Sequence, residues 1–185
     1  MRAIDVHAGI VGTQSASEVQ DKGLAMAQTL RWADEQDTRG LAERMARSTA
    51  LRNAFIALQG ELGAGKTSFV RHLLRALGVS GRVKSPTYAV LEQYEAQDAL
   101  GQPLVVSHFD FYRFNDAREF DDAGFRDLFA APGLKLAEWP EKALGALPAA
   151  DLQMLVQVQS DGQRLVELQA FSPAGQDLLD EAIHS

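Results

Sequence analysis

The sequence has no cysteine, and this absence excludes disulfide bonds, thiolate metal sites and a cysteine nucleophile. No apolar run approaches the length of a membrane span, and residues 1–10 carry an acidic side chain but no long apolar core or small-residue cleavage site. Such a start is not typical of a secretory signal. We therefore expect a cytoplasmic protein that makes no membrane contact.

Basic residues are in the minority, with 18 Lys and Arg against 25 Asp and Glu and a formal net charge of −7. A protein that grips nucleic acid through its overall field needs clustered cations to contact the phosphates. We therefore expect any link to RNA to be indirect.

The length and composition predict a globular protein. The 185 residues include 46% hydrophobic and 23% charged residues, which is ordinary for a folded domain. Residues 1–30 show small polar residues and glycines without a sustained period, so we expect an irregular N-terminal extension. Residues 31–185 are expected to form one α/β domain.

The pattern within residues 31–185 alternates between helix and strand. Residues 34–49 and 66–77 have helical spacing, and residues 53–59 form a short apolar run typical of a buried parallel strand. Further strands are expected at residues 88–94, 104–112 and 134–139. Residues 152–159 and 164–171 alternate around a Ser-Asp-Gly turn, which predicts a C-terminal antiparallel hairpin, and residues 175–183 predict a last helix.

Residues 60–67 read Gly-Glu-Leu-Gly-Ala-Gly-Lys-Thr and form a complete phosphate-binding loop between a strand and a helix. Glycines let the backbone bring its amide groups toward phosphate oxygens, and the N-terminus of the next helix adds the positive end of its dipole. Lys66 is expected to reach the β- and γ-phosphates, and the Thr67 hydroxyl to bind Mg²⁺. The loop therefore predicts an ATPase that uses ATP and Mg²⁺.

Such a loop needs an acidic partner that holds the metal ion and polarises water. Asp110 and Glu138 each follow a strand-like run, and the spacing does not rank them. His108 lies two residues before Asp110, but no third or fourth metal ligand accompanies the pair. We therefore favour a packing or hydrogen-bonding role for His108 over metal ligation.

Three further features keep more than one interpretation. Residues 84–88 read Lys-Ser-Pro-Thr-Tyr, which suits a loop that senses the γ-phosphate and equally an ordinary turn. Trp139 fits a core position or a partner contact. Arg71 and Arg113 are candidates for an arginine finger. Arginines are common on protein surfaces, however, and we favour an ordinary surface position for both.

Taken together, the motifs resemble those of the TsaE (also YjeE) ATPase family over residues 34–158. The resemblance rests on the phosphate-binding loop, on Val-Lys-Ser-Pro-Thr-Tyr at 83–88, on His-Phe-Asp-Phe-Tyr-Arg at 108–113 and on Glu-Trp-Pro at 138–140. The first motif occurs in many nucleotide-binding proteins, whereas the other three together are specific. Ser68 stands where the family usually has a second threonine, and Phe111 stands where leucine is frequent.

The resemblance implies a P-loop NTPase three-layer sandwich with a central, mostly parallel sheet. It implies catalytic roles for Lys66, Asp110, Glu138 and Thr87, and Mg²⁺ ligation by Thr67 and Glu138. The implied nucleotide contacts are Thr38, Gly60, Glu61, Leu62, Gly63, Ala64, Gly65, Lys66, Thr67 and Ser68. It also implies a role in threonylcarbamoyladenosine modification of tRNA, and TsaD and TsaB proteins as partners that link the chain to tRNA. We expect weak hydrolysis by the chain alone, because that partner surface is then absent.

Two other functions remain open from the residues. A small-molecule or nucleoside kinase also fits a phosphate-binding loop on a domain of this size, although no arginine-rich lid run is visible. A nucleotide-gated binding protein would use ATP to order residues 85–88 without depending on hydrolysis.

Overall fold

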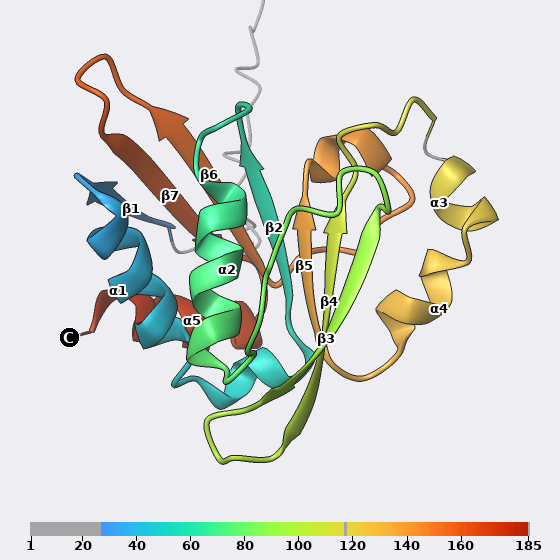
Figure 1. Ribbon diagram of the computed structural model, residues 1–185, viewed down its shortest axis with the longest axis horizontal. Helices are drawn as coiled ribbons and strands as arrows, with labels where there is room; N and C mark the ends of the chain where they lie inside the picture. Colours follow the sequence, from blue (N-terminus) through green and yellow to red (C-terminus); the bar gives the residue numbers. More distant parts are fainter. Residues whose placement is uncertain (1–26, 117, 185) are drawn as a thin grey trace, which may run out of the picture.

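The computed structural model of the protein describes residues 27–116 and 118–184, which form one mixed sheet with helices on both faces (Figure 1). Seven strands lie in the order β1-β7-β6-β2-β5-β4-β3. Their bounds are β1 Ala27–Trp32, β2 Phe55–Gly60, β3 Leu91–Gln97, β4 Pro103–Asp110, β5 Leu134–Glu138, β6 Leu152–Val158 and β7 Arg164–Ala170. The central strands β6, β2, β5 and β4 pair in parallel, and β1, β7 and β3 join the two margins antiparallel. The predicted α/β fold class and the C-terminal hairpin are thus confirmed.

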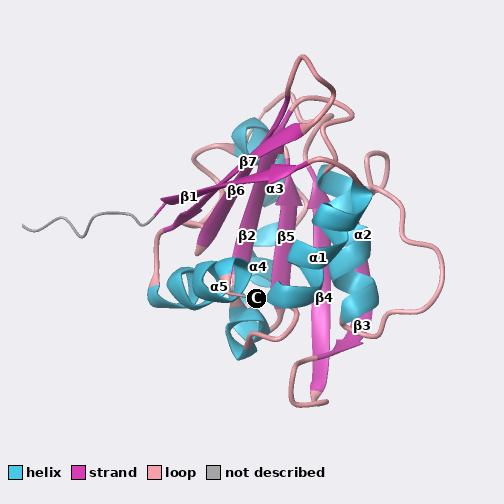
Figure 2. Cartoon of the chain, turned by 90° about the vertical axis from the view of Figure 1, so that its left-hand side faces the viewer, coloured by secondary structure: helices cyan, strands magenta, loops and turns pink. Residues whose placement is uncertain are grey.

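Two helical layers cover the sheet. On one face lie α1 (Glu35–Met45) and α2 (Lys66–Ala76), with α5 (Pro173–Ile183) packed against α1 and the β6–β7 hairpin. The other face carries α3 (Arg118–Asp122), α4 (Phe125–Ala130) and the short 3₁₀ helix η2 (Pro140–Ala143), whereas the 3₁₀ helix η1 (Thr49–Asn53) leads into β2. Figure 2 shows α1 and α2 on one side of the sheet. No helix among the described residues is long and apolar enough to cross a bilayer.

Side chains of the central strands point alternately into two separate hydrophobic cores, one on each face of the sheet. On β2, Ile56 and Leu58 point into the cluster under α1 and α2, and Phe55 and Ala57 point into an aromatic cluster under α4. Because successive residues of a strand face opposite sides, a strand buried on both faces is continuously apolar. Packing on both faces fixes the position of β2 in the sheet and therefore the position of the loop that follows it.

The first strand was not expected. Residues 27–30 lie in the predicted irregular extension, yet they belong to β1, which pairs with β7 along its whole length. Leu30 and Trp32 face the core, whereas Arg31 between them is exposed. The six-residue alternation is too short to stand out without its partner strand, because edge strands gain their order from pairing. The rest of the expected extension, residues 1–26, lies outside the described residues.

Other boundaries move by a few residues. The predicted strand at 88–94 starts only at Leu91, because the chain before it forms a turn in which Val90 adopts a left-handed φ of 67°. The first predicted helix ends at Met45, and Thr49 begins η1. The last helix starts two residues earlier than predicted, at Pro173, after Ser172 as its N-cap. A proline in the first turn leaves no helical hydrogen bond unmade, so it suits this start.

Candidate functional site

The phosphate-binding loop connects the end of β2 to the first turn of α2. Gly60, Gly63 and Gly65 all have positive φ angles, of 137°, 80° and 117°. A Cβ atom on Gly60 would lie 2.3 Å from the carbonyl oxygen of Val156, so only glycine fits there. The loop thus brings the N-terminus of α2, where the first amide groups have no partner within the helix, to the edge of a cavity.

Lys66 folds back over its own loop. Its Nζ donates to the carbonyl oxygens of Gly60 at 2.7 Å and Glu61 at 2.9 Å, and it lies 4.1 Å from the centre of the Trp139 ring. Burial lowers the pKa of this ammonium group, and the nearby charges of Glu138 and other acids oppose the shift. The ammonium group therefore lies against the loop backbone, and the Lys66 side chain also lines the adjacent cavity.

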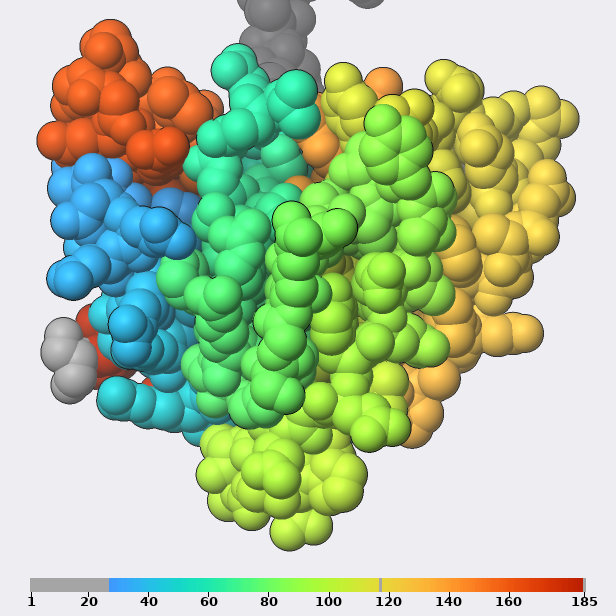
Figure 3. All heavy atoms as spheres, in the orientation of Figure 1, coloured from blue at the N-terminus to red at the C-terminus, as the bar shows by residue number. Residues whose placement is uncertain are grey.

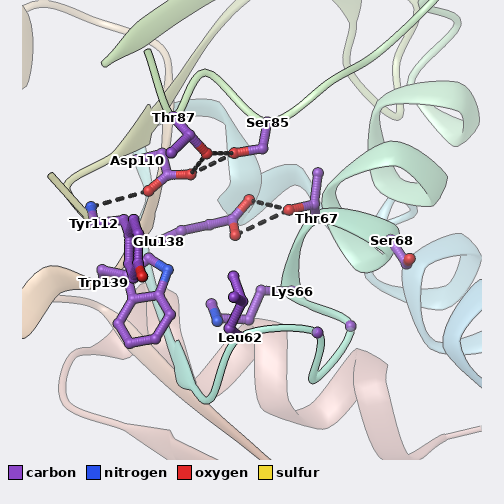
Figure 4. Close-up of a pocket in the computed structure, with 12 residues that line it drawn as sticks. Leu62, Lys66, Thr67, Ser68, Ser85, Thr87, Asp110, Tyr112, Glu138 and Trp139 are labelled. Atoms are coloured by element: carbon purple, nitrogen blue, oxygen red, sulfur yellow. Dashed lines mark hydrogen bonds between the residues drawn. The ribbon is translucent and has the colours of Figure 1, made fainter. Parts of the chain in front are cut away.

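Glu138 joins the loop to the sheet (Figure 4). The Thr67 hydroxyl lies 2.8 Å and 3.0 Å from its two carboxylate oxygens, and His108 Nε2 lies 2.9 Å from Oε1. His108 is fully buried and Glu138 is 3% exposed. The structure thus confirms the hydrogen-bonding role predicted for His108. It also selects Glu138 as the acid that contacts the loop threonine.

Asp110 faces the cavity from the neighbouring strand. Its Oδ2 accepts hydrogen bonds from Ser85 Oγ and, at 2.6 Å, from Thr87 Oγ1, while Oδ1 accepts the amide of Tyr112 at 3.0 Å. The loop at 84–88 is therefore tied to a buried carboxylate. This arrangement favours the interpretation of that loop as part of the site over an ordinary turn.

Strand register places the two acids together. Asp110 and Glu138 are direct partners in the parallel pair β4–β5, and Glu138 is in register with Leu58 on β2. The backbone amide of Phe111 donates to the Glu138 carbonyl at 3.0 Å, which extends the pairing past the last residue of β4. Because parallel strands end at the same edge of the sheet, acids far apart in sequence meet beside the loop after β2.

Trp139 turns toward the site directly after β5. Its backbone is left-handed, with a φ of 57°, and its half-buried ring lies against Lys66 and 5.0 Å from the ring centre of Tyr112. The sequence left a core position and a partner contact open for Trp139. In the structure it forms one wall of the cavity.

Two cavities lie on either side of the start of α2. The larger, of about 230 Å³, is lined by Leu62, Gly63, Gly65, Lys66, Thr67, Ser68, Ser85, Thr87, Asp110, Tyr112, Glu138 and Trp139. The smaller, of about 140 Å³, is lined by Trp32, Asp34, Glu35, Thr38, Ala64, Gly65, Ser68 and Arg164. All four predicted catalytic residues line the larger one. Thr38 and Ala64 line the smaller, and Gly60 and Glu61 contribute their carbonyl groups to Lys66 without lining either.

Several lining residues escaped sequence reasoning. Tyr112 follows the predicted Asp110 by two residues, and Trp32 and Arg164 are partners in the β1–β7 pair. The position of Trp32 two residues before the helix N-cap Asp34 is a signal that could have pointed to it. Arg164 carried no such signal, because only the hairpin brings it to the loop. Neither finger candidate, Arg71 nor Arg113, lines either of these two cavities.

The oxygen-rich donor set suits a hard divalent cation. Thr67 Oγ1 and the carboxylates of Glu138 and Asp110 lie around one cavity, and oxygen atoms are the ligands that Mg²⁺ prefers. Among the described residues no group of three or more His, Cys, Asp or Glu side chains is arranged to hold a metal ion by itself.

The fold and the loop define an α/β protein of the P-loop NTPase fold class. Residues 32–166 match the family model described as "Threonylcarbamoyl adenosine biosynthesis protein TsaE". The chain is 38% identical over 124 residues to the tRNA threonylcarbamoyladenosine biosynthesis protein TsaE of Haemophilus influenzae, covering 67% of this chain and 75% of the relative. The protein of the same name from Bacillus subtilis is 30% identical over 154 residues, which cover 82% of this chain and 92% of the relative.

A solved structure agrees with these matches. The crystal structure of Bacillus subtilis YdiB superposes with a TM-score of 0.70 at 24% identity, covering 86% of this chain and 95% of that one. This likeness supports the fold. The family model and the relatives show that the chain belongs to the TsaE family, whose name assigns its members to threonylcarbamoyladenosine biosynthesis.

Proposed function

We propose that the protein binds ATP with Mg²⁺ and hydrolyses it in support of tRNA threonylcarbamoyladenosine modification. The observation that carries the proposal is the contact of Thr67 with Glu138 beside Lys66, at the mouth of a glycine-rich loop. This contact gathers a cation, a hydroxyl and a buried carboxylate around one cavity. Those are the groups that phosphoryl transfer from a nucleoside triphosphate requires.

In this proposal nucleotide binding changes the partners of Lys66, Thr67 and Glu138. Lys66 leaves the carbonyl groups of Gly60 and Glu61 and turns toward the phosphates, which offer its ammonium a stronger, charge-assisted partner. Thr67 and Glu138 would hold Mg²⁺ in place of part of their mutual hydrogen bonding. When bound, Mg²⁺ neutralises charge that develops on the phosphate oxygens.

Asp110 and Thr87 act on the other side of the cavity. Asp110 supports the metal site and orients an attacking water, and Thr87 lies within 2.6 Å of the same carboxylate. The loop at residues 84–88 is hydrogen-bonded to Asp110, so in this proposal its conformation changes when the γ-phosphate is present or lost. The smaller cavity, with Thr38 beside Gly65 and Ser68, is suited to the nucleoside part of the ligand.

The family name and the relatives support the pathway, and we further propose TsaD and TsaB proteins as partners that provide the link to tRNA. Hydrolysis by the chain alone is expected to be slow, because the partner surface is absent. A cytoplasmic location, without membrane contact, stays a prediction from the sequence.

The test is phosphate release from Mg-ATP by the purified full chain, alone and with TsaB and TsaD proteins. We expect release that the two proteins stimulate, and its loss in Lys66→Ala. Lys142→Ala is the matched control, because Lys142 is exposed and lies outside both cavities. Retention of full ATP and magnesium binding by Lys66→Ala would show that the site is assigned wrongly.

Candidate nucleosides belong in the same assay. Transfer of the phosphate to a nucleoside, with no response to the two proteins, would replace the ATPase with a kinase. If ATP stimulated binding to the TsaB and TsaD proteins without any phosphate release, the result would indicate a nucleotide-gated binding protein instead.

A further inference from the structure

The acidic chain contains one long segment without a single acid. Between Glu61 and Glu92 there is no Asp or Glu, and five Lys and Arg occur there. One of the five, Lys66, belongs to the nucleotide site. The other four, here called the basic strip, are Arg71, Arg75, Arg82 and Lys84.

The basic strip lies on neighbouring elements. Arg71 and Arg75 belong to α2, and Arg82 and Lys84 belong to the segment that runs back beside α2 after it ends. Figures 1 and 3 both show this segment next to α2 on the same face of the molecule. Arg75, Arg82 and Lys84 are exposed and Arg71 is half-buried.

No carboxylate lies within ion-pair distance of the basic strip in the described residues. Outside the strip, five described arginines pair with carboxylates, namely Arg31, Arg39, Arg52, Arg118 and Arg126, whereas four others do not. Unpaired cations on one face attract an anionic partner even when the net charge of the protein is negative, because local charge governs contacts shorter than a Debye length.

An aromatic platform stands at the end of the basic strip. Tyr88 follows Lys84 by four residues and is 85% exposed, and the guanidinium carbon of Arg113 lies 4.1 Å from its ring centre. A cationic strip that ends in an exposed ring matches the way proteins hold unpaired nucleic acid, with phosphates on Lys and Arg and a base against an aromatic face. A carboxylate-rich protein surface would use the cations but would not need the ring.

We propose that the basic strip, together with Tyr88, docks the sugar-phosphate backbone and an unpaired base of RNA. The contact does not depend on ATP hydrolysis. It is weak, because the rest of the chain repels a polyanion, and strongly dependent on salt. The net charge led us to expect only indirect contact with RNA. In this proposal the face that carries the basic strip is the exception to that expectation.

The test measures fluorescence anisotropy of a labelled oligouridine of about twelve nucleotides, a length within the usual range of such sites. We expect a Kd of roughly 10⁻⁴ to 10⁻⁶ M near physiological salt. The variant Arg75→Glu/Arg82→Glu should weaken binding about tenfold or more and lower the salt slope by about two. Neither residue lies in the nucleotide site, so phosphate release from ATP should stay unchanged.

The matched control is Arg39→Glu/Arg126→Glu, which makes the same change in charge on exposed parts of α1 and α4. It should bind oligouridine nearly as well as the parent. Tyr88→Ala should weaken binding of oligouridine but not of inorganic polyphosphate. Melting curves of all variants exclude unfolding as the cause of a loss.

Three results would overturn the proposal. The first is no binding even at low salt. The second is an equal loss in the two charge variants, which would point to net charge alone. The third is tight binding of polyglutamate with no effect of Tyr88→Ala, which would assign the basic strip to an acidic protein partner.

Discussion

At the residue scale, Glu138 is held by burial and by two hydrogen-bond partners. It is buried at the end of β5, and its carboxylate is shared between the hydroxyl of Thr67 and the imidazole of His108. A buried carboxylate is retained only where partners or a cation compensate for its lost hydration. The carboxylate is thus placed to exchange one of these partners for a metal ion.

We predict that Glu138→Gln lowers the rate of ATP hydrolysis by about 10²-fold or more while changing nucleotide affinity much less. The amide keeps the shape of the side chain but lacks the negative charge that would hold the metal ion in the proposed function. Calorimetric titration with ATP and a phosphate-release assay separate the two effects. Glu141→Gln is the control, since Glu141 is exposed and lies outside both cavities; equal losses of binding and turnover in Glu138→Gln would contradict the assigned role.

At the scale of elements, the start of α5 is fixed by a close backbone approach. Asp151, just before β6, accepts the amide of Phe55 at 2.7 Å and the hydroxyl of Ser172 at 2.5 Å. Ser172 in turn accepts the amide of Gly175 at 3.0 Å, in the first turn of α5. A Cβ atom on Gly175 would lie 1.8 Å from the carbonyl oxygen of Asp151.

We predict that Gly175→Ala destabilises the fold by about 1–3 kcal/mol, because the new methyl group meets backbone that cannot yield without moving α5. Gly40→Ala, inside α1, should instead stabilise it by about 0.5–1 kcal/mol, since its Cβ meets nothing nearer than Arg44 Nη1 at 3.5 Å. Urea unfolding of both variants measures the difference. A Gly175→Ala protein as stable as the parent would show that α5 docks more loosely than the structure indicates.

At the scale of the whole molecule, ligand binding and folding are linked. A ligand that binds only the folded state stabilises it by about 2.7 kcal/mol at 100 times its Kd. For a chain of this size we predict that saturating Mg-ATP raises Tm by roughly 5–10 °C. Lys66→Ala should show no such rise, and thermal melts with and without Mg-ATP make the comparison; a rise of the same size in Lys66→Ala would place the nucleotide elsewhere.

Acid should weaken the fold through particular carboxylates. The backbone amides of Gln102 and Leu100 and the nearby Arg52 lower the pKa of Asp98, and the Arg118 guanidinium lowers the pKa of Asp116 to about 2. A carboxyl group with a lowered native pKa stabilises the fold above its unfolded pKa near 4, and that stabilisation is lost as the pH falls through the native pKa. The window for this loss is therefore about pH 4 down to about pH 2.

We predict that the parent is more stable than Asp98→Asn at neutral pH and that the difference shrinks as the pH falls below about 4. Denaturant unfolding at several pH values measures it. Asp177→Asn, on exposed α5 surface, should show no such dependence. A difference between parent and Asp98→Asn that stays constant across this range would assign the stabilisation to something other than ionised Asp98.

The phosphate-binding loop and the elements that flank it could be predicted from local sequence alone. Glycine spacing, the lysine and the threonine depend on local backbone geometry, so Gly60 to Thr67 could be placed between a strand and a helix without tertiary knowledge. The hairpin of β6 and β7 was predicted for the same reason, because its turn and alternation are local. The resemblance to the family added the order of the remaining motifs.

Which distant groups meet depends on strand pairing and packing, and could not be predicted from local sequence. The sequence offered Asp110 and Glu138 without ranking them, and strand register then set Glu138 against Thr67 and Asp110 against Ser85 and Thr87. Strand β1 and the lining residue Arg164 were missed, because both depend on pairing between segments more than a hundred residues apart. Local chemistry is written in neighbouring residues, whereas a cavity forms where packing brings separate strands to one edge.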